Sequence, residues 1–250
     1  MTERTLDGRR ALVTGGASGI GAAIGRELAT RGAHVTIADR DGEGAARLAQ
    51  ELGGEAWVVD LADTRALDEL RLDIDVLVNG AGIQKVAPIE AFDPEDFRRI
   101  HAIMLEAPFL LIRAVLPGMY ARGWGRIVNI SSVHGLVASP FKSAYVAAKH
   151  GLEGLSKVTA LEGGPHGVTS VCVSPGYVRT PLVERQVADQ AQAHGIPEAQ
   201  VVEDVLLGQA AVKRLVEPEE VASLVAWLTG PDASMVTGTS VTMDGGWSAR

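Results

Sequence analysis

The chain has 250 residues, 46% of them hydrophobic and 4% aromatic, and it carries a formal net charge of −8 at pH 7. This length fits one α/β domain or two small ones, and the apolar content is enough for a substantial buried core. The acidic balance argues against a nucleic-acid partner or an anionic membrane partner, because either would need a basic surface.

Location and metal binding can also be addressed from the composition. The first ten residues, MTERTLDGRR, hold no apolar run, and no window is long enough to span a bilayer, so we expect no secretory signal and a cytoplasmic protein. The single cysteine, Cys172, excludes an intrachain disulfide and is expected to be a small buried residue. The six histidines are scattered without the spacing of metal ligands, so no metal is expected.

Apolar, strand-like runs alternate with helical stretches along the chain. Strands are expected at 10–13, 34–38, 55–59, 74–78, 126–130, 168–173 and 240–243, and helices at 18–31, 41–52, 94–121, 143–162 and 218–228. The connection 62–72 has room for a helix of only about two or three turns. The alternation predicts one α/β domain spanning 1–250, a doubly wound Rossmann fold with a parallel sheet of about seven strands flanked by helices.

The first expected strand breaks into glycines, Thr14-Gly-Gly-Ala-Ser-Gly-Ile-Gly21, before the pattern becomes helical. Gly15 permits the turn, Gly19 lets the backbone approach a pyrophosphate, and Gly21 allows the helix to pack closely on the strand. The helix N-terminus offers free N–H groups and a partial positive charge to phosphates. The spacing is G-x-x-x-G-x-G rather than the standard dinucleotide fingerprint.

The second expected strand ends in a carboxylate, Asp39. An acidic residue at about this spacing hydrogen-bonds the adenosine ribose, and its charge repels a 2′-phosphate, which favours NAD over NADP. Arg40 follows immediately and could accept that phosphate, so the alternative cofactor stays open.

The pair Tyr145 and Lys149 is four residues apart, so both side chains project from one face of the expected helix 143–162. A free phenol titrates near pH ~10. A nearby ammonium stabilises the phenolate and lowers that pKa, which makes the tyrosine a usable base. Ser132, thirteen positions before the tyrosine, can supply a hydroxyl that steadies the oxygen of an alcohol or a carbonyl.

Candidate ligand-binding residues follow the ends of the expected strands: Gly15, Asp39, Asp60, Asn79, Ser132 and Pro175. Because ligands bind an open α/β sheet beyond the carboxyl ends of its strands, these residues are expected to face one cleft. The long non-periodic stretch at about 174–200 is predicted to be a mobile lid over the substrate.

These motifs together resemble the short-chain dehydrogenase/reductase family over essentially the whole chain, although Gly80 replaces a more usual Asn. Ser132, Tyr145 and Lys149 match the catalytic residues of that family. The resemblance implies an NAD site made of Gly15, Ser18, Gly19, Ile20, Gly21, Asp39, Asp60, Leu61, Asn79, Ala81, Gly82, Tyr145, Lys149, Pro175, Gly176, Val178 and Thr180.

Substrate choice must come from polar residues in the loops around Tyr145, and four stand out: Gln84, His134, Lys142 and Gln186. We refer to these four residues as the carboxylate clamp, because Lys142 can supply charge and the others hydrogen bonds to a carboxylate. Each has an ordinary alternative when taken alone. A loop glutamine is usually solvated, Lys142 could be a surface charge, and His134 could cap a turn.

The segments around the clamp closely resemble the bacterial D-3-hydroxybutyrate dehydrogenases, a branch of the same family in which matching residues hold the substrate carboxylate. The resemblance implies reversible NAD-dependent oxidation of (R)-3-hydroxybutyrate, or a similar short 3-hydroxy acid, to acetoacetate. Tyr145 would be the general base, Ser132 would bind the same oxygen, and Tyr177, where relatives often carry tryptophan, would line the substrate pocket. The resemblance also implies a homotetramer in which helices 94–121 and 143–162 pair between subunits.

One position departs from the family pattern. Met104 stands where the family usually has an asparagine that kinks the long helix and holds a water in the proton path. A methionine cannot do this hydrogen bonding, so either another polar group, such as His101 or Glu106, or bulk water is expected to relay the proton. Pro108 in mid-helix should bend it locally.

Three alternatives remain on the sequence alone. Another enzyme of the family, a 3-oxoacyl-thioester reductase, is disfavoured by Asp39 and by the acidic charge, since a carrier-bound substrate needs a basic docking surface. A polyol or sugar dehydrogenase is the second. The third is a non-catalytic NAD-binding protein, which the missing asparagine suggests and the complete set of Ser132, Tyr145 and Lys149 opposes.

Overall fold

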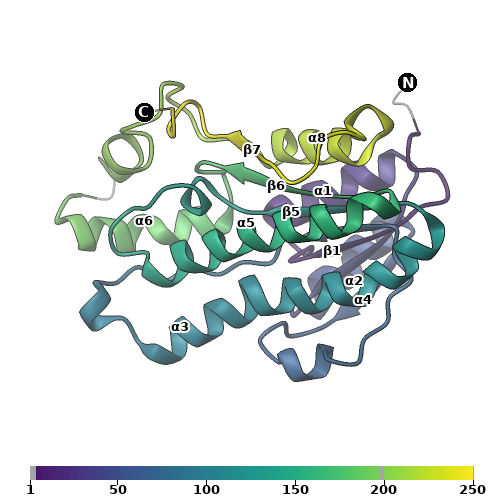
Figure 1. The fold of residues 1–250 in the computed structure, drawn as a ribbon. Coiled ribbons are helices and arrows are strands. Elements are labelled where there is room, and N and C mark those ends of the chain that lie inside the picture. The colour runs from purple at the N-terminus through teal and green to yellow at the C-terminus, as the bar shows by residue number, and fades with distance from the viewer. Residues whose placement is uncertain (1–3, 198–199, 250) are drawn as a thin grey trace.

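One parallel sheet of seven strands forms the centre of the protein (Figure 1). The strands are β1 (Arg10–Thr14), β2 (His34–Asp39), β3 (Glu55–Val58), β4 (Val76–Asn79), β5 (Gly125–Ile130), β6 (Val168–Pro175) and β7 (Ser240–Met243). Their order across the sheet is β3-β2-β1-β4-β5-β6-β7, and neighbours are parallel throughout. The winding reverses between β1 and β4, the position at which doubly wound folds bind ligands. The structure is a computed structural model, and it describes residues 4–197 and 200–249.

Helices cover both faces of the sheet, and each face has its own hydrophobic core. The helices are α1 (Gly19–Thr30), α2 (Gly42–Leu52), α3 (Pro94–His101), α4 (Ala107–Arg122), α5 (Ser143–Gly163), α6 (Pro181–His194) and α8 (Pro218–Thr229). Helices α1, α2 and α8 pack on one face around side chains such as Ile24 and Val225. Helices α4 and α5 lie side by side on the other face around Leu111 and Ala148 (Figure 1).

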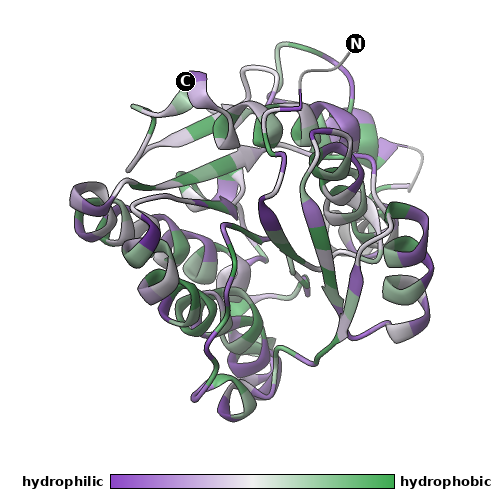
Figure 2. Ribbon diagram, turned by 90° about the vertical axis from the view of Figure 1, so that its right-hand side faces the viewer, coloured by the Kyte–Doolittle hydropathy of each residue, from purple (hydrophilic) through white to green (hydrophobic). Residues whose placement is uncertain are grey.

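The sequence pattern of the strands follows from this arrangement. Every residue of β4, β5 and β6 is buried, because helices exclude water from both faces of a parallel sheet. Figure 2 shows hydrophobic segments along the strands and along the helices beside them. The predicted α/β fold with about seven parallel strands is confirmed, and the predicted strand ends differ by at most two residues from those observed. Cys172 is buried in β6, as expected.

The long helix expected at 94–121 is interrupted by a π-helical turn, Ala102–Glu106, between α3 and α4. In this turn the N–H of Ala107 donates to the carbonyl of Ala102, five residues back. Pro108 follows directly, and its ring has no N–H with which to continue an α-helical register. The expected irregularity near Pro108 is therefore a widened turn, a feature that often marks functional sites.

The expectation that no stretch is long enough to span a bilayer is wrong for the segment Pro94–Arg122. It has 29 residues, and its most apolar window has a mean hydropathy of 1.6, so it is long and apolar enough by composition alone. However, 56% of that window is buried inside the protein, where α4 packs on the sheet. Its apolar character is accounted for by its place in the core.

Two connections also differ from the expectations. Most of the stretch 174–200, expected to be a non-periodic loop, is the helix α6, at the left of Figure 1. Thr180 caps it by accepting a hydrogen bond from the N–H of Val183, and Pro181 occupies its first turn, so local capping outweighed the weak periodicity. In the connection 62–72 the helix is shorter than expected, a single 3₁₀ turn at Thr64–Leu67.

Candidate active site

A cleft of about 550 Å³ opens beyond the carboxyl ends of the strands. Most of the predicted site residues line it, although they come from widely separated parts of the chain. They are Gly15, Ser18, Gly19, Ile20, Gly21, Asp39, Asp60, Leu61, Ala81, Gly82, Gln84, Ser132, His134, Lys142, Tyr145, Lys149, Pro175, Gly176, Tyr177, Val178 and Thr180. The cleft thus runs from the glycine turn after β1 to the loops around the start of α5.

The glycine turn at one end of the cleft has no room for side chains. Gly15 has a φ of +65°, and a Cβ there would lie 2.7 Å from the Cα of Ala81. A Cβ on Gly21 would lie 2.2 Å from the carbonyl oxygen of Gly15, so Gly21 is required by the turn itself rather than by packing of the helix on the strand. The start of α1 is therefore free to present its N–H groups to a phosphate.

Asp39 ends β2 beside that turn. Its carboxylate accepts hydrogen bonds from the backbone N–H of Ala17 at 3.1 Å and from that of Asp41 at 3.0 Å. These contacts fix the carboxylate in the cleft next to the glycine turn, where a ribose hydroxyl would meet it. The residues of this end fit the adenosine and pyrophosphate parts of a nicotinamide dinucleotide, and Arg40 lines the same region.

Ser132, Tyr145 and Lys149 meet in the middle of the cleft. Ser132 follows β5, and its hydroxyl hydrogen-bonds the phenol of Tyr145, which stands in the first turn of α5. Burial raises the pKa of Tyr145, and the hydrogen bond to Ser132 opposes that shift. Lys149 is buried one turn further along the helix, and its ammonium lies 5.6 Å from the centre of the tyrosine ring.

Lys149 does not act on the tyrosine as directly as the sequence suggested. Its Nζ donates to the carbonyl oxygen of Ile130 at 2.6 Å, and it is not among the groups that shift the pKa of Tyr145. Burial lowers the pKa of Lys149 itself to about 8. The expected lowering of the pKa of Tyr145 is thus absent, because burial of the phenol outweighs the distant charge.

The far end of the cleft holds a buried cation without an acidic partner. Lys142 is only 3% exposed, and its Nζ donates to the hydroxyl of Tyr177 at 2.8 Å. Burial lowers the pKa of Lys142 to about 8, and no acidic side chain of the described residues contributes to that shift. A buried ammonium that lacks a counter-charge is costly, so this end of the cleft favours an anionic ligand.

Two further members of the clamp line the same cleft as Lys142. His134 is 3% exposed and its ring hydrogen-bonds the hydroxyl of Ser139 at 2.9 Å; burial lowers its pKa to about 3, so the ring is neutral. The Nε2 donor of Gln84 is buried and has no hydrogen-bond partner among the described residues. Gln186 belongs to α6, but its side chain lies outside the described part of the structure.

Three predicted polar residues do not reach the cleft. Asn79 is 3% exposed and donates to Asn129 at 2.8 Å, so it braces β4 against β5 behind the site. His101 and Glu106, suggested as proton relays, line a separate outer hollow between the α3–α4 segment and α5. Met104 is 1% exposed and its methyl group faces Gly82, so it fills the space in which a polar side chain was expected.

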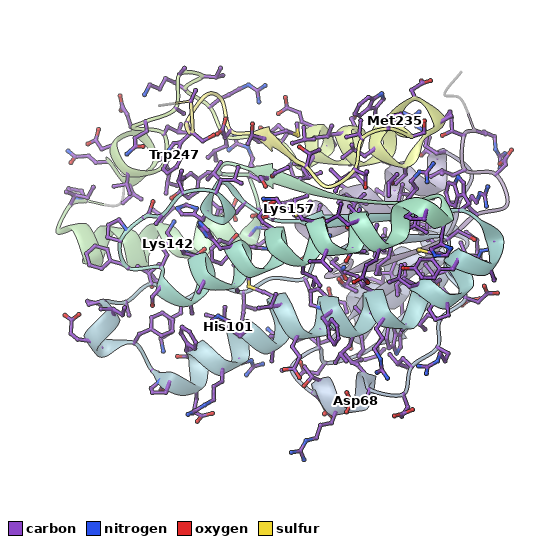
Figure 3. All side chains as sticks on the ribbon, viewed as in Figure 1. Asp68, His101, Lys142, Lys157, Met235 and Trp247 are labelled. Carbon is purple, nitrogen blue, oxygen red and sulfur yellow. The ribbon has the colours of Figure 1, made fainter. Side chains whose placement is uncertain are left out.

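Several residues of the site gave no signal in the sequence. The walls include the apolar Val59, Ile83, Ile103 and Leu182, which cannot be told from core residues by type. Trp247 packs against His134, with ring centres 5.6 Å apart, and Figure 3 shows it at the same end of the molecule as Lys142. The resemblance to the bacterial D-3-hydroxybutyrate dehydrogenases implied that this tryptophan lies near the site of a symmetry-related subunit; in the structure it packs against His134 of its own chain. Within the described ranges no three His, Cys, Asp or Glu side chains are grouped as a metal would need.

The fold and the site define an oxidoreductase that binds a nicotinamide dinucleotide and acts on a CH–OH group. A family model described as enoyl-(acyl carrier protein) reductase matches residues 15–248, and the chain belongs to the short-chain dehydrogenase/reductase family.

Relatives with assigned names match almost the full length of the chain. A D-β-hydroxybutyrate dehydrogenase of Rhizobium meliloti is 46% identical over 97% of this chain and 99% of its own length. Another of the same name from Cupriavidus necator is 42% identical over 98% and 100%. A solved Agrobacterium tumefaciens structure with bound NADP, described as a 2-deoxy-D-gluconate 3-dehydrogenase, is 32% identical, covers 100% of both chains and has a TM-score of 0.86.

Proposed function

We propose that the protein oxidises (R)-3-hydroxybutyrate, or a similar short 3-hydroxy acid, to acetoacetate with NAD⁺, and that the reaction is reversible. The observation that carries the proposal is the uncompensated ammonium of Lys142, buried in the cleft that the unpartnered Nε2 donor of Gln84 and the neutral ring of His134 also line. A carboxylate of the substrate would meet all three. The two similar D-β-hydroxybutyrate dehydrogenases support the same substrate class.

In the proposed reaction NAD⁺, when bound, supplies the hydride acceptor for the hydrogen on C3 of the substrate. Tyr145, in its phenolate form, removes the proton of the C3 hydroxyl, and Ser132 donates a hydrogen bond to the same oxygen. Lys149 lines the same cleft, and its ammonium would hold the nicotinamide ribose beside Tyr145. One hydride and one proton leave the alcohol, and the products are acetoacetate and NADH.

NAD rather than NADP is proposed as the cofactor. The glycine turn leaves space for a pyrophosphate, and the fixed carboxylate of Asp39 would accept hydrogen bonds from a ribose and repel a 2′-phosphate. The similar Agrobacterium structure holds NADP, so the choice between NAD and NADP is tested by kinetics. A kcat/KM for NAD⁺ well above that for NADP⁺ would support the assignment of Asp39.

We further propose that the protein works as a homotetramer in the cytoplasm and that residues 1–250 form one domain. We also propose that the segment 174–200 closes over the substrate. The tetramer proposal is supported by apolar side chains exposed along the α3–α4 segment and α5, including Phe109 and Leu161. The lid proposal is supported by Thr180, Pro181 and Leu182, which lie in the cleft lining at the start of α6.

An NAD⁺-reduction assay with (R)- and (S)-3-hydroxybutyrate tests the function, repeated with Lys142→Ala. Loss of a hydrogen bond to a charged group costs about 1.5–3 kcal/mol, so KM for the R enantiomer should rise roughly 10- to 100-fold. Lys157→Ala is the matched control, because Lys157 is an exposed lysine further along α5 (Figure 3). A 3-oxoacyl thioester or a polyol turned over in preference to 3-hydroxybutyrate, or NADH binding without any turnover, would contradict the proposal.

A further inference from the structure

A buried carboxyl group lies behind the cleft, where the reaction as described makes no use of it. Glu153 is one helical turn beyond Lys149 on α5 and is 5% exposed. Tyr145, Lys149 and Glu153 are spaced by four residues, so they form one stripe along the same face of the helix. The carboxyl group therefore shares the interior with the ammonium of Lys149.

Two serine hydroxyls supply hydrogen bonds to the carboxylate of Glu153. Its Oε1 accepts from the hydroxyl of Ser174 at 2.8 Å and from that of Ser240 at 3.1 Å, and the two hydroxyls are 2.6 Å apart. Ser174 is fully buried in β6, directly before the Pro175-Gly176 pair that lines the cleft. A buried carboxylate needs a counter-charge as well as donors, and Lys149, buried four residues earlier on the same face of α5, is a cation whose charged form Glu153 favours.

The buried ammonium of Lys149 also lacks a hydrogen-bonded counter-charge in the part of the chain that the structure describes. The hydrogen bond of its Nζ goes to a neutral carbonyl, that of Ile130, and burial disfavours its charged form. The other titratable groups beside it are Tyr145 on α5 and Cys172 on β6. Burial raises the pKa of both, so both are neutral at pH 7. Among the described residues, Glu153 is thus the carboxylate that can balance the charge of Lys149.

We propose that Glu153 is a positioning residue of this active site: its buried carboxylate, fixed by two serine hydroxyls, is the counter-charge that keeps Lys149 protonated at neutral pH. The inference rests on the proposed dehydrogenase function, in which Lys149 must be an ammonium. It also accounts for a carboxyl group in the interior on the helix that carries Tyr145 and Lys149.

Glu153→Gln tests the proposal, because it removes the charge and keeps an oxygen for the serine hydroxyls. The chain has five lysines, Lys85, Lys142, Lys149, Lys157 and Lys213, so NMR of ¹³C-labelled lysine can follow each ammonium. The signal lost in Lys149→Arg identifies Lys149. Loss of a nearby opposite charge should lower its pKa by about one unit. The alkaline limb of kcat/KM should move to lower pH by the same amount.

Glu162→Gln is the matched control, since Glu162 is exposed on the same helix, and it should leave both readouts unchanged. A folded Glu153→Gln protein with an unchanged pKa of Lys149 would overturn the proposal. If that variant does not fold, Glu153→Met removes the charge with an apolar side chain of similar length and is judged by the same readouts. The NMR titration needs no substrate, so failure to oxidise 3-hydroxybutyrate would contradict the proposed function alone.

Discussion

The titratable side chains of the cleft differ from their exposed counterparts because water is excluded from them. Burial lowers the pKa of His134 to about 3 and the pKa values of Lys142 and Lys149 to about 8. At neutral pH the site thus contains two ammonium groups close to losing their charge and a neutral imidazole. An anion should therefore bind this buried site more tightly than it would bind the same groups in water, because it supplies the counter-charge that the site lacks.

Tyr145→Phe should abolish turnover and leave NADH binding within a few-fold of wild type. The change removes only the hydroxyl that would take the substrate proton and its hydrogen bond with Ser132. Loss of a general base typically costs about 10²–10⁴-fold in rate. Steady-state kinetics and NADH fluorescence titration measure the two effects. Near-normal activity in this variant would refute the assignment of the base.

His134 makes the folded state sensitive to acid in a defined window. Its pKa is about 3 in the fold against an ordinary 6.5, so below pH 6.5 the unfolded chain binds a proton that the folded protein does not. Stability should therefore fall as the pH drops, by about 1.4 kcal/mol per pH unit. Between pH 6.5 and 5 the expected loss is about 2 kcal/mol, or roughly 4–8 °C in Tm.

Thermal unfolding of wild type and His134→Gln across that range checks this expectation. The glutamine cannot titrate, so the variant should lose clearly less stability than wild type on acidification. The range stops above pH 4.5, because lowered carboxyl pKa values, such as that of Asp75, add their own loss of stability below it. Parallel curves for the two proteins would show that His134 is not the group responsible.

At the scale of helices and turns, the π-helical turn before Pro108 shows what the sequence could and could not predict. The sequence indicated an irregularity, because proline lacks an N–H. It did not indicate that Met104 would be sealed into the core or that His101 and Glu106 would face the outer hollow. The positions of these three side chains depend on how the widened turn rotates the residues around it. That rotation cannot be predicted from residue type.

Met104→Asn should leave turnover within about threefold of wild type and lower Tm. The site of Met104 is closed and apolar, so a buried amide would cost about 1–3 kcal/mol without a ready partner. Met104→Leu, which conserves volume, is the control for packing. Steady-state kinetics and thermal unfolding of the three proteins separate the effects. A large gain in turnover with asparagine would mean that the native proton relay is impaired.

The seven strands and most helix ends were predictable because their signals are local. Apolar runs, the glycine turn and the capping residues around Pro218 each act within a few positions. Helix α6 was not predicted, since its periodicity is weak and only the Thr180 cap and Pro181 mark its start. The titratable residues of the cleft were found because their chemistry is visible in their type. The apolar walls and Glu153 were not, since only the fold brings them there.

At the scale of the whole molecule, several large apolar side chains are exposed along the α3–α4 segment and α5. Phe97, Phe109, Val158 and Leu161 are between 41% and 79% exposed along the α3–α4 segment and α5. The outer hollow of about 580 Å³ between these helices is also mainly apolar. Contiguous exposed patches of this kind mark protein interfaces in soluble proteins. In the proposed tetramer the same helices of a second copy would cover this surface.

Phe109→Asp should therefore convert the proposed tetramer into smaller species at micromolar concentration. The side chain is 49% exposed on α4 at the edge of the hollow, so a carboxylate there would have to be desolvated on assembly. Val58→Asp is the matched control, because Val58 is 63% exposed on β3, the edge strand away from these helices. Light scattering after size exclusion measures both. A monomeric wild type, or a Phe109→Asp protein that remains tetrameric, would contradict the assembly through these helices. Retained NADH binding in the dissociated variant would show that each subunit forms its own cofactor cleft.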